Sequence, residues 1–402
     1  MENLSQNPAM SQPSPKNRYF IALLAILVVP LSGLSTDIFV PSMPEIRGVF
    51  DTTQGAVQLT ITAYMLGLGV MQLFAGAISD SFGRKKPFII ATIAYLLATF
   101  AIPHVATIYQ LIGLRLIQGA TVAAMVVPMR AVLSDLFKGK EFEKITTYMA
   151  FAWTIGPIIA PFIGGYLTHY FGWEANFYFL VIYSAVVFAF ILLNMPETTS
   201  YYNEFKLGAI ASRYRTILTN RDFLAAGLTN GFTYGLVMIV TAVTPFLLKN
   251  QLHFSPIEFG YFALTLGVGW SIGSLSNRFL MHYSLASKMR VGVTGLIAFG
   301  AVLLASMVWL PLSIYSLVVP LFFIYTIGGM LVTVNFSFAL SLFPSMSASA
   351  NALFGGTLFF VASLVSGIAA QFHFESAAAL GFSVMALIAL IALAQKLRSP
   401  KA

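Results

Sequence analysis

Two ionisable residues, Asp37 and Arg115, lie inside long apolar stretches of this 402-residue chain, away from the basic clusters that bound those stretches. A charged side chain at the centre of a membrane helix costs about 2.5–3.5 kcal/mol on insertion scales, and less near the interface, so such residues are functional candidates. A carboxylate can take up and release a proton, and a nearby guanidinium can shape its proton affinity. We therefore predict that Asp37 couples protons to function and that Arg115 assists it.

A structural role is the alternative for each residue. Asp37 could cap its helix through hydrogen bonds near Ser35 and Pro41, and Arg115 could bind the carbonyl groups of a helix end. At about 1.5 Å per residue, both side chains fall at similar depths below the same predicted surface, which allows a direct or water-bridged pair. In that hypothesis, protonation of Asp37 from outside releases a substrate, and deprotonation inside lets another bind.

The composition places these residues in a membrane protein. Apolar residues make up 58% of the chain and charged residues 9%, whereas a typical soluble domain has about 25% charged residues. The absence of cysteine excludes a disulfide framework, a thiolate metal site and a cysteine nucleophile. The net charge of +8 lies beside apolar stretches rather than in one patch, so no nucleic acid partner is expected.

Apolar stretches separated by charged or turn residues predict an all-α membrane protein with twelve transmembrane helices of about 20 residues each. Lys and Arg fall almost entirely in one set of loops, and only Arg47 and Lys249 in the other. This asymmetry predicts a multi-pass protein with both termini in the cytoplasm. No pair among the five histidines has metal-ligand spacing on one helix, so no metal site is expected. The predicted spans are 19–40, 55–78, 88–105, 108–132, 145–168, 174–194, 221–247, 256–277, 289–310, 313–336, 348–370 and 376–396.

The longest internal loop divides the chain into two halves, and part of that loop, 203–218, could form a surface helix. The first span is too long for a signal-peptide core and has no small-residue cleavage site, so it should remain in the protein. We predict a disordered cytoplasmic tail at 1–18, an N-terminal six-helix bundle at 19–194, a cytoplasmic linker at 195–220, a C-terminal six-helix bundle at 221–396 and a cytoplasmic tail at 397–402.

The loop after the second span carries Gly76, Asp80, Gly83 and Arg84, followed by two lysines. Gly76 would permit close helix packing and Gly83 a tight turn, while Asp80 could bond neighbouring backbone or Arg84. This spacing resembles motif A of the major facilitator superfamily, G-x-x-x-D-x-x-G-R-[RK]-[RK]. The alternative is an ordinary positive-inside loop.

Two further spans carry patterns of the same superfamily. In the fourth span, Arg115, Gln118 and Gly119 resemble motif B, R-x-x-Q-G. The fifth span resembles motif C, G-P-x-x-[GA]-P-x-x-G-G, which is associated with antiporters; a kinked membrane helix is the alternative. Its matching residues are Gly156, Pro157, Pro161, Gly164 and Gly165.

Shorter stretches narrow the resemblance to Bcr/CflA-type drug:proton antiporters. Ser35 to Pro44 resembles the end of their first helix, Arg130 with Asp135 the end of the fourth, and Met195 to Thr198 the exit from the sixth. The resemblance covers the N-terminal half in order, and the C-terminal half mainly by span count. It implies two pseudo-symmetric six-helix bundles, each of 3+3 inverted repeats, with substrate bound between them near the midplane.

The resemblance implies a monomeric, proton-coupled secondary transporter of the bacterial inner membrane, which exports a drug, metabolite or siderophore by alternating access. It would need no cofactor beyond the proton gradient. Uptake by proton symport is the alternative. An enzyme is not expected, because the intramembrane polar residues are too sparse for a catalytic cluster, and a channel would need a ring of repeated filter residues.

Roles for further residues follow from the same resemblance. Asp80, Arg84, Arg130 and Asp135 would form a conformational latch at the cytoplasmic helix ends, unless they only direct topology. Some related exporters carry a second acid two turns before the first-helix aspartate, where this chain has Val28, Val29 and Pro30. A neutral, zwitterionic or anionic substrate would therefore fit. Candidates for the substrate cavity, each with helix packing as its alternative, are Gln58, Tyr64, Gln118, Asn230, Tyr234, Trp270 and Asn335.

Overall fold

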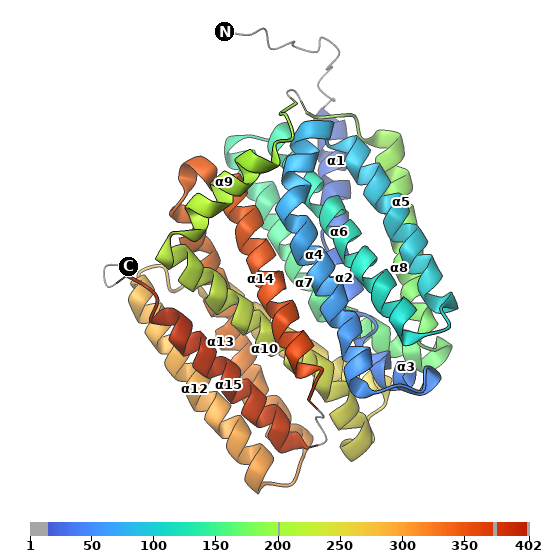
Figure 1. The fold of residues 1–402 in the computed structure, drawn as a ribbon, viewed down its shortest axis with the longest axis vertical. Helices are drawn as coiled ribbons and strands as arrows, with labels where there is room; N and C mark the ends of the chain where they lie inside the picture. Colours follow the sequence, from blue (N-terminus) through green and yellow to red (C-terminus); the bar gives the residue numbers. More distant parts are fainter. Residues whose placement is uncertain (1–14, 200–201, 373–375, 400–402) are drawn as a thin grey trace.

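The computed structural model describes residues 15–199, 202–372 and 376–399, and every regular element in these ranges is a helix (Figure 1). Residues 1–14 of the predicted N-terminal tail and 400–402 of the C-terminal tail lie outside the described ranges. Eleven segments are long and apolar enough to cross a membrane. A twelfth helix, α11 (Pro256–Ser276), also has spanning length, 21 residues, but its glycines, serines and Glu258 lower its mean hydropathy.

The first span is interrupted, because Pro30 has no N–H to donate to the preceding turn and Pro41 breaks the ladder again. It consists of α1 (Pro15–Val28), α2 (Leu31–Asp37), the 3₁₀ turn η1 (Val40–Ser42) and α3 (Met43–Val49), so Asp37 ends a helix in the middle of the span. The other N-terminal helices are α4 (Gln54–Phe82), α5 (Lys85–Ala101), the 3₁₀ turn η2 (Ile102–His104), α6 (Ile108–Leu136), α7 (Gly139–Phe171) and α8 (Glu174–Asn194).

The second half has the six further long helices that the sequence predicts, preceded by a short surface helix at the position expected for one. Several helices run past the predicted spans, because backbone hydrogen bonding continues into polar sequence where the apolar stretch has ended. The elements are α9 (Leu207–Leu218), α10 (Arg221–Leu252), α11, α12 (Leu285–Trp309), α13 (Ile314–Ser341), the 3₁₀ turn η3 (Pro344–Met346), α14 (Ser347–Ala369) and α15 (Ala377–Gln395).

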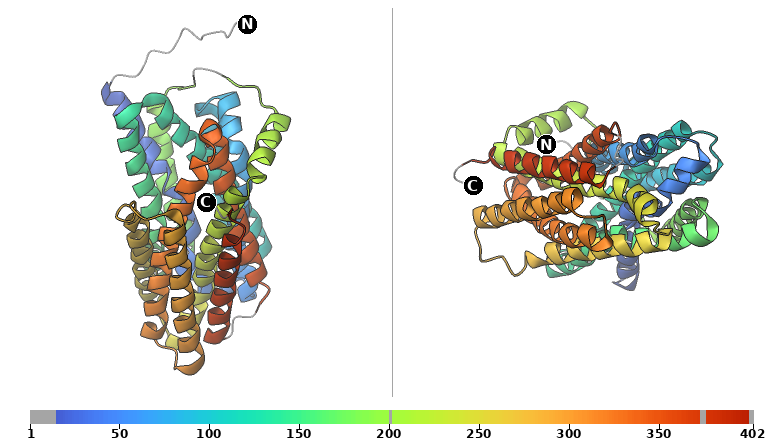
Figure 2. Two further views of the ribbon diagram at one scale, coloured as in Figure 1. Left: turned by 90° about the vertical axis from the view of Figure 1, so that its left-hand side faces the viewer. Right: turned by 90° about the horizontal axis from the view of Figure 1, so that it is seen from below.

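The helices form two bundles that lie side by side (Figures 1 and 2). Helices α1 to α8, blue to green, make one bundle, and α10 to α15, yellow to red, make the other. We call them the N bundle and the C bundle. They meet where α4 packs against α14 and α7 packs against α11. The turn η1 and helix α3 also contact α10, so the interrupted first span borders the interface.

Glycines allow the closest helix contacts within the N bundle. A Cβ atom on Gly164 of α7 would lie 1.7 Å from the carbonyl oxygen of Ile38, and one on Gly119 of α6 would lie 1.9 Å from that of Tyr64. Only glycine fits where backbones approach so closely. Gly156 and Pro157 make further contacts of this kind with the first span, so the motif C residues hold the segment that carries Asp37.

An adjacent face of α7, about 100° around the helix, reaches the C bundle. A Cβ atom on Gly165 would lie 2.4 Å from the carbonyl oxygen of Pro256 in α11. The prediction that Gly76 permits close helix packing was wrong. The nearest atom to its Cβ position is a methyl carbon of Val127, 4.0 Å away. This glycine fills no tight contact, and its role in the motif is not one of helix packing.

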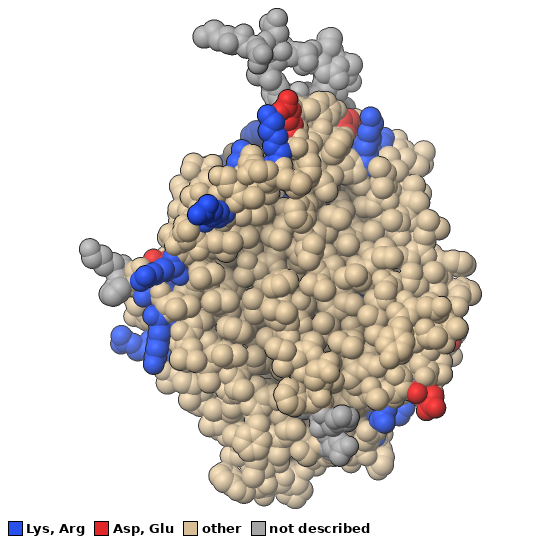
Figure 3. All heavy atoms as spheres, in the orientation of Figure 1, with Lys and Arg blue, Asp and Glu red and all other residues tan. Residues whose placement is uncertain are grey.

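Charged side chains gather at one end of the molecule. In Figure 3, Lys and Arg lie along the upper and left margins, over the region of the α4–α5 loop, α9 and the chain termini. We call this end, which holds the α4–α5, α6–α7 and α11–α12 loops and α9, the basic end. The opposite end holds the loops before α4 and after α10, with Arg47 and Lys249.

Candidate functional site

A cavity lies between the two bundles, with about 750 Å³ of empty space that includes part of its mouth. Its N-bundle wall consists of the Asp37–Val40 segment and one face of α7, and its C-bundle wall comes from α10, α11 and α13. Most of the wall is apolar or aromatic, as in small-molecule sites generally. The principal side chains are Asp37, Val40, Trp153, Thr154, Pro157, Pro161, Tyr234, Phe259, Phe262, Trp270 and Tyr325.

Asp37 is the one carboxylate in this wall, and no Lys, Arg or His shares the cavity. The residue is 5% exposed, and no ion pair or hydrogen bond reaches its carboxylate from the residues that the structure describes. The capping bonds considered from the sequence are therefore not formed. A nearly buried carboxylate with one face toward a cavity is positioned to meet a proton or a polar group of a substrate.

Arg115 lies beside the cavity wall rather than in it. Its guanidinium is completely buried between the rings of Phe39 and Tyr64, with its central carbon 4.4 Å from each ring centroid. One Nη donates to the carbonyl oxygen of Ser35, at 2.7 Å, and to the side chain of Gln118. Among the described residues, Arg115 therefore forms no direct ion pair with Asp37. It forms instead the hydrogen bond to a backbone carbonyl that was the structural alternative for this residue.

The Arg115 guanidinium still has unused donors. Its Nε and second Nη are buried without a hydrogen-bond partner among the described residues. An unpaired buried donor is costly, so stacking on two ring faces must offset part of that cost. The positive charge of Arg115 acts on the Asp37 carboxylate through space rather than through a hydrogen bond.

Two of the residues predicted to line the cavity instead hold Arg115. Tyr64 stacks on the guanidinium, and its hydroxyl donates to the carbonyl oxygen of Ser32 at 3.0 Å. Gln118 accepts from Arg115 and donates to Thr99 at 2.9 Å. The prediction of a cavity role was wrong for both, because these helices are apolar all round and the sequence does not indicate which side of each helix faces the interface.

Three more predicted cavity residues lie elsewhere. Gln58 donates across the bundle interface to the carbonyl oxygen of Ala242, at 3.2 Å. Asn230 donates to the carbonyl oxygen of Val332 at 3.0 Å, and Asn335 donates within its own helix and accepts from Arg398. In each case the NH2 group of the buried amide donates to a backbone carbonyl, which indicates a structural role for these side chains.

Tyr234 and Trp270 do line the cavity, where they form part of an aromatic wall. The Trp270 ring stands edge-on to Tyr234, at 6.4 Å between centroids, and to Tyr325, at 6.3 Å. Sequence reasoning missed Tyr325 and Trp153. The second could have been found, since Trp153, Pro157 and Pro161 recur every four residues and therefore share one face of α7.

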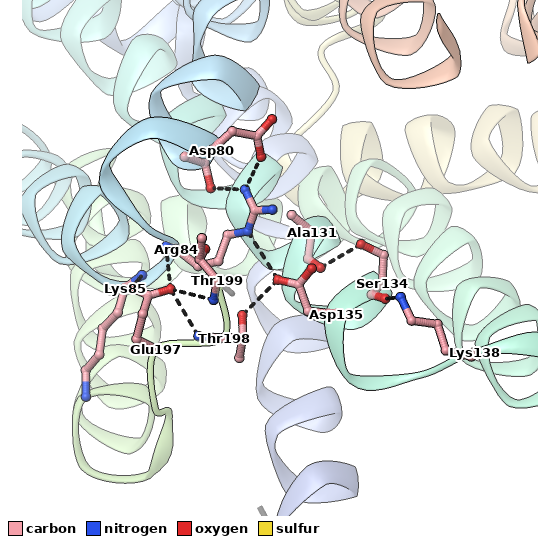
Figure 4. Close-up of polar contacts among 11 residues, drawn as sticks. Asp80, Arg84, Lys85, Ala131, Ser134, Asp135, Lys138, Glu197, Thr198 and Thr199 are labelled. Carbon is pink, nitrogen blue, oxygen red and sulfur yellow. Dashed lines mark hydrogen bonds and ion pairs between the residues drawn. The ribbon is translucent and has the colours of Figure 1, made fainter. Parts of the chain in front are cut away.

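A second polar cluster lies at the basic end, and Figure 4 shows it. The Arg84 guanidinium donates to Asp80 and, at 3.2 Å, to Asp135 of α6. Burial alone would lower the pKa of Arg84, but its hydrogen bond to Asp80 and the attraction of Asp135 outweigh this and raise it. Three of the four residues predicted as a latch therefore come together, all within the N bundle.

Arg130, the fourth predicted latch residue, lies apart from this cluster. Its Nε is buried and has no hydrogen-bond partner among the described residues. It stands five residues before Asp135 on α6, which turns it about 140° away around the helix. The prediction that Arg130 shares the ion-pair cluster was wrong, because proximity in sequence does not place two helical residues on one face.

Glu197, in the exit from α8, is a member of the cluster that sequence reasoning missed. Its carboxylate accepts from the backbone N–H groups of Arg84, at 2.8 Å, and Lys85, at 3.0 Å, and so caps the start of α5. Gly83 makes room for it: its φ is +88°, and a Cβ atom there would lie 2.5 Å from the Glu197 carboxylate. A capping carboxylate is stabilised by the helix dipole as well as by these bonds.

Replacing Glu197 by Gln should lower the free energy of unfolding by about 1 kcal/mol at pH 7. Burial alone would raise the pKa of Glu197, but hydrogen bonds from the backbone N–H groups of Arg84 and Thr199 outweigh it and lower the pKa. The folded protein therefore binds this proton less tightly than the unfolded chain. The stabilisation is present above the ordinary pKa of 4.5 and is lost as the pH falls through the lowered value.

Thermal unfolding of the detergent-solubilised protein at pH 7 and near pH 4 would check this expectation. The difference between wild type and Glu197→Gln should narrow at the lower pH. Glu204→Gln is the matched control, because Glu204 is 76% exposed and pairs only with the exposed Lys206. An equal loss of stability in both variants would contradict the capping role.

Comparison with known proteins places this geometry among transporters. Residues 25–367 match the family model described as Major Facilitator Superfamily. A Bacillus subtilis protein named as an uncharacterised MFS-type transporter, YdgK, is 29% identical, with 89% of this chain and 90% of that protein covered. The bicyclomycin resistance protein homolog of Haemophilus influenzae is 27% identical, with 93% and 94% covered.

Further relatives and solved structures agree. Multidrug resistance protein D of Escherichia coli is 26% identical, with 84% of each chain covered. The crystal structure of a D-xylose-proton symporter superposes with a TM-score of 0.79 at 15% identity, covering 94% of this chain and 97% of that one. A bacterial homolog of the human lysosomal transporter Spinster, inward-facing and unoccupied, gives 0.70 at 15% identity, covering 96% and 97%. At such identities the structural matches show the fold.

Proposed function

Because this chain belongs to the Major Facilitator Superfamily, whose members are transporters rather than enzymes, we propose that it exports a small organic molecule in exchange for protons. The relatives named for bicyclomycin, chloramphenicol and multidrug resistance support export over uptake. Their bacterial sources support a place in a bacterial inner membrane. The proton gradient would supply the energy, without another cofactor, and one chain would suffice because its two bundles enclose the cavity.

The observation that carries this proposal is Asp37 in the cavity wall. It is the one carboxylate among the lining residues, which include no Lys, Arg or His, it is nearly buried, and it has no protein partner in the described part of the chain. A carboxylate in such a place can be satisfied by a proton or by a substrate. Exchange transport requires that the proton and the substrate bind to this carboxylate in turn and not at the same time.

Orientation follows from the basic end. Lys and Arg on loops next to membrane helices stay on the cytoplasmic side, so the basic end would face the cytoplasm with both termini. At the opposite end, η1 and α3 lie against α10, and α7 lies against α11. These contacts support a state that is closed to the outside. Rocking of the bundles would separate them and expose Asp37 to the external proton supply.

The cavity chemistry bears on the substrate. The sequence predicted that a neutral, zwitterionic or anionic substrate would fit at least as well as a cation, on the assumption that Arg115 shares the cavity with Asp37. That assumption loses its basis, because Arg115 is enclosed by Phe39 and Tyr64. One carboxylate and the rings of Trp153, Trp270 and the two tyrosines suit a neutral molecule or a cation with flat apolar groups.

The proposal is tested with purified protein in liposomes that hold a preformed proton gradient, acid inside. Addition of bicyclomycin, chloramphenicol or a lipophilic cation should dissipate the gradient for at least one compound, while protein-free liposomes should not respond. Movement of proton and substrate in the same direction would replace export by symport. If the compound crosses without any proton movement, proton coupling itself is refuted.

A further inference from the structure

The short helix α9, between the two bundles in sequence, spans the seam between them at the basic end. Ile217 of α9 is completely buried, in a cluster with Phe223 of α10 and Phe354 of α14. Tyr214, one turn earlier, donates its hydroxyl to the carbonyl oxygen of Leu73 in α4, at 2.6 Å. Helix α9 is thus attached to both bundles through one of its faces.

The apolar surface of α9 is wider than the face that docks. Leu207 and Leu218 are 59% and 42% exposed, and Ala211 is exposed as well. At about 100° per residue these three side chains lie within about 40° of one another, next to the docked face. Exposed leucines at the end of a membrane bundle continue its lipid-facing surface, so this stripe fits the boundary between acyl chains and headgroups.

Two arginines flank the surface that the apolar stripe and the docked face form together. Arg215 lies about 60° to one side of the centre of the stripe, and Arg213 lies about 140° to the other side, beyond the docked face. Both are exposed, and neither has a hydrogen bond or ion pair with any residue that the structure describes. Figure 3 shows basic side chains at the surface in the region where Figure 1 draws α9. Free guanidinium groups on a helix that carries an interfacial apolar stripe match phosphate in charge and geometry.

We propose that α9 is an interfacial helix that binds the headgroups of anionic phospholipids through Arg213 and Arg215, with its leucine stripe in the acyl boundary. Each basic residue near an anionic membrane surface increases binding about fivefold, so the pair would give roughly 25-fold. The bound lipid would hold α9 in the plane of the membrane. Because α9 contacts Leu73 on one bundle and Phe354 on the other, lipid charge would stabilise the arrangement of the seam seen here.

The chain has no cysteine, so a single Ala211→Cys variant can carry one fluorophore on the exposed stripe of the full-length protein. Vesicles would contain phosphatidylethanolamine with about 20% phosphatidylglycerol as the anionic lipid, and one of the two lipids would be brominated in each preparation. Per lipid molecule, brominated phosphatidylglycerol should quench the fluorophore several-fold more strongly than brominated phosphatidylethanolamine. Equal quenching by both lipids, or quenching by neither, would overturn the proposal.

Matched variants separate charge from folding. Arg213→Gln with Arg215→Gln should abolish the preference for phosphatidylglycerol, whereas Arg213→Lys with Arg215→Lys should retain it. Lys140→Gln with Lys144→Gln removes the same charge from α7 at the same end, and should leave the preference intact. Loss of the preference in that control would assign the effect to the general surface charge. Loss on addition of soluble inorganic phosphate would make α9 a site for a free anion. Either result would refute lipid recognition by α9.

Discussion

Replacing Asp37 by Asn should abolish substrate-driven proton movement while leaving the protein folded. Asn has nearly the same volume and can still hydrogen-bond, but it cannot take up a proton at any pH of interest. For a cationic substrate, the lost charge should also weaken binding about 10- to 100-fold, since a hydrogen bond to a charged group is worth about 1.5–3 kcal/mol. Binding of a neutral substrate should change little.

Proton flux and equilibrium binding would be measured on the same reconstituted samples. Asp51→Asn is the matched control: it makes the same chemical change on an exposed turn at the opposite end, where φ is +42° and Asn is well tolerated. Asp37→Glu keeps the titratable group and should retain partial coupling. Continued proton exchange in Asp37→Asn would mean that the coupling group lies elsewhere and that Asp37 only shapes the cavity.

Replacing Gly164 by Ala should strongly lower the free energy of unfolding, whereas the same replacement at Gly76 should not. The added Cβ would lie 1.7 Å from the carbonyl oxygen of Ile38, which is backbone and cannot rotate away. Overpacking against movable side chains costs about 1–3 kcal/mol, so we expect at least about 3 kcal/mol here. Because Ile38 follows Asp37 directly, a shift of its carbonyl group would also move the Asp37 carboxylate. The Gly164→Ala protein that does fold should therefore show altered proton coupling.

Gly76→Ala gives the control for this prediction. It makes the same substitution inside a long helix of the same bundle, but the new methyl group would be 4.0 Å from Val127, in ordinary contact. Alanine is favoured over glycine in a helix by about 1 kcal/mol, so this variant should be neutral or stabilised. Unfolding temperatures of the two variants in detergent provide the comparison. Similar values would show that the α2–α7 contact relaxes without cost.

Most of the spans and their approximate positions could be predicted from the sequence because apolar length indicates them, although α11 has a lower mean hydropathy than the others. The sixth span, 174–194, coincides with α8, and the surface helix predicted at 203–218 appears as α9. The interruption of the first span at Pro30 was not anticipated, although a proline without N–H requires one. A hydropathy pattern locates an apolar stretch but does not indicate where the helix within it is interrupted.

The cavity was harder to predict than the fold. In a soluble helix the polar side points to water, but lipid-facing and buried sides are both apolar here, so periodicity does not assign a face. Tyr64 and Gln118 therefore looked like cavity residues and turned out to support Arg115. Asp37 could be found because a charged residue in an apolar stretch is energetically costly, whichever side of the helix it occupies, and is therefore a functional candidate.

The aromatic enclosure of Arg115 has a consequence for where the transport cycle can be switched. Phe39, Tyr64 and Asp37 all belong to the N bundle, as does Arg115 itself. When two bundles rock as rigid bodies, distances within one of them stay constant. The field that Arg115 exerts on Asp37 is then a fixed background, the same in every state. What varies is the opposite wall, where Tyr234, Trp270 and Tyr325 approach or recede. In the proposed exchange, the C bundle, which contributes no charged side chain to the cavity, would therefore determine when Asp37 gains or loses its proton.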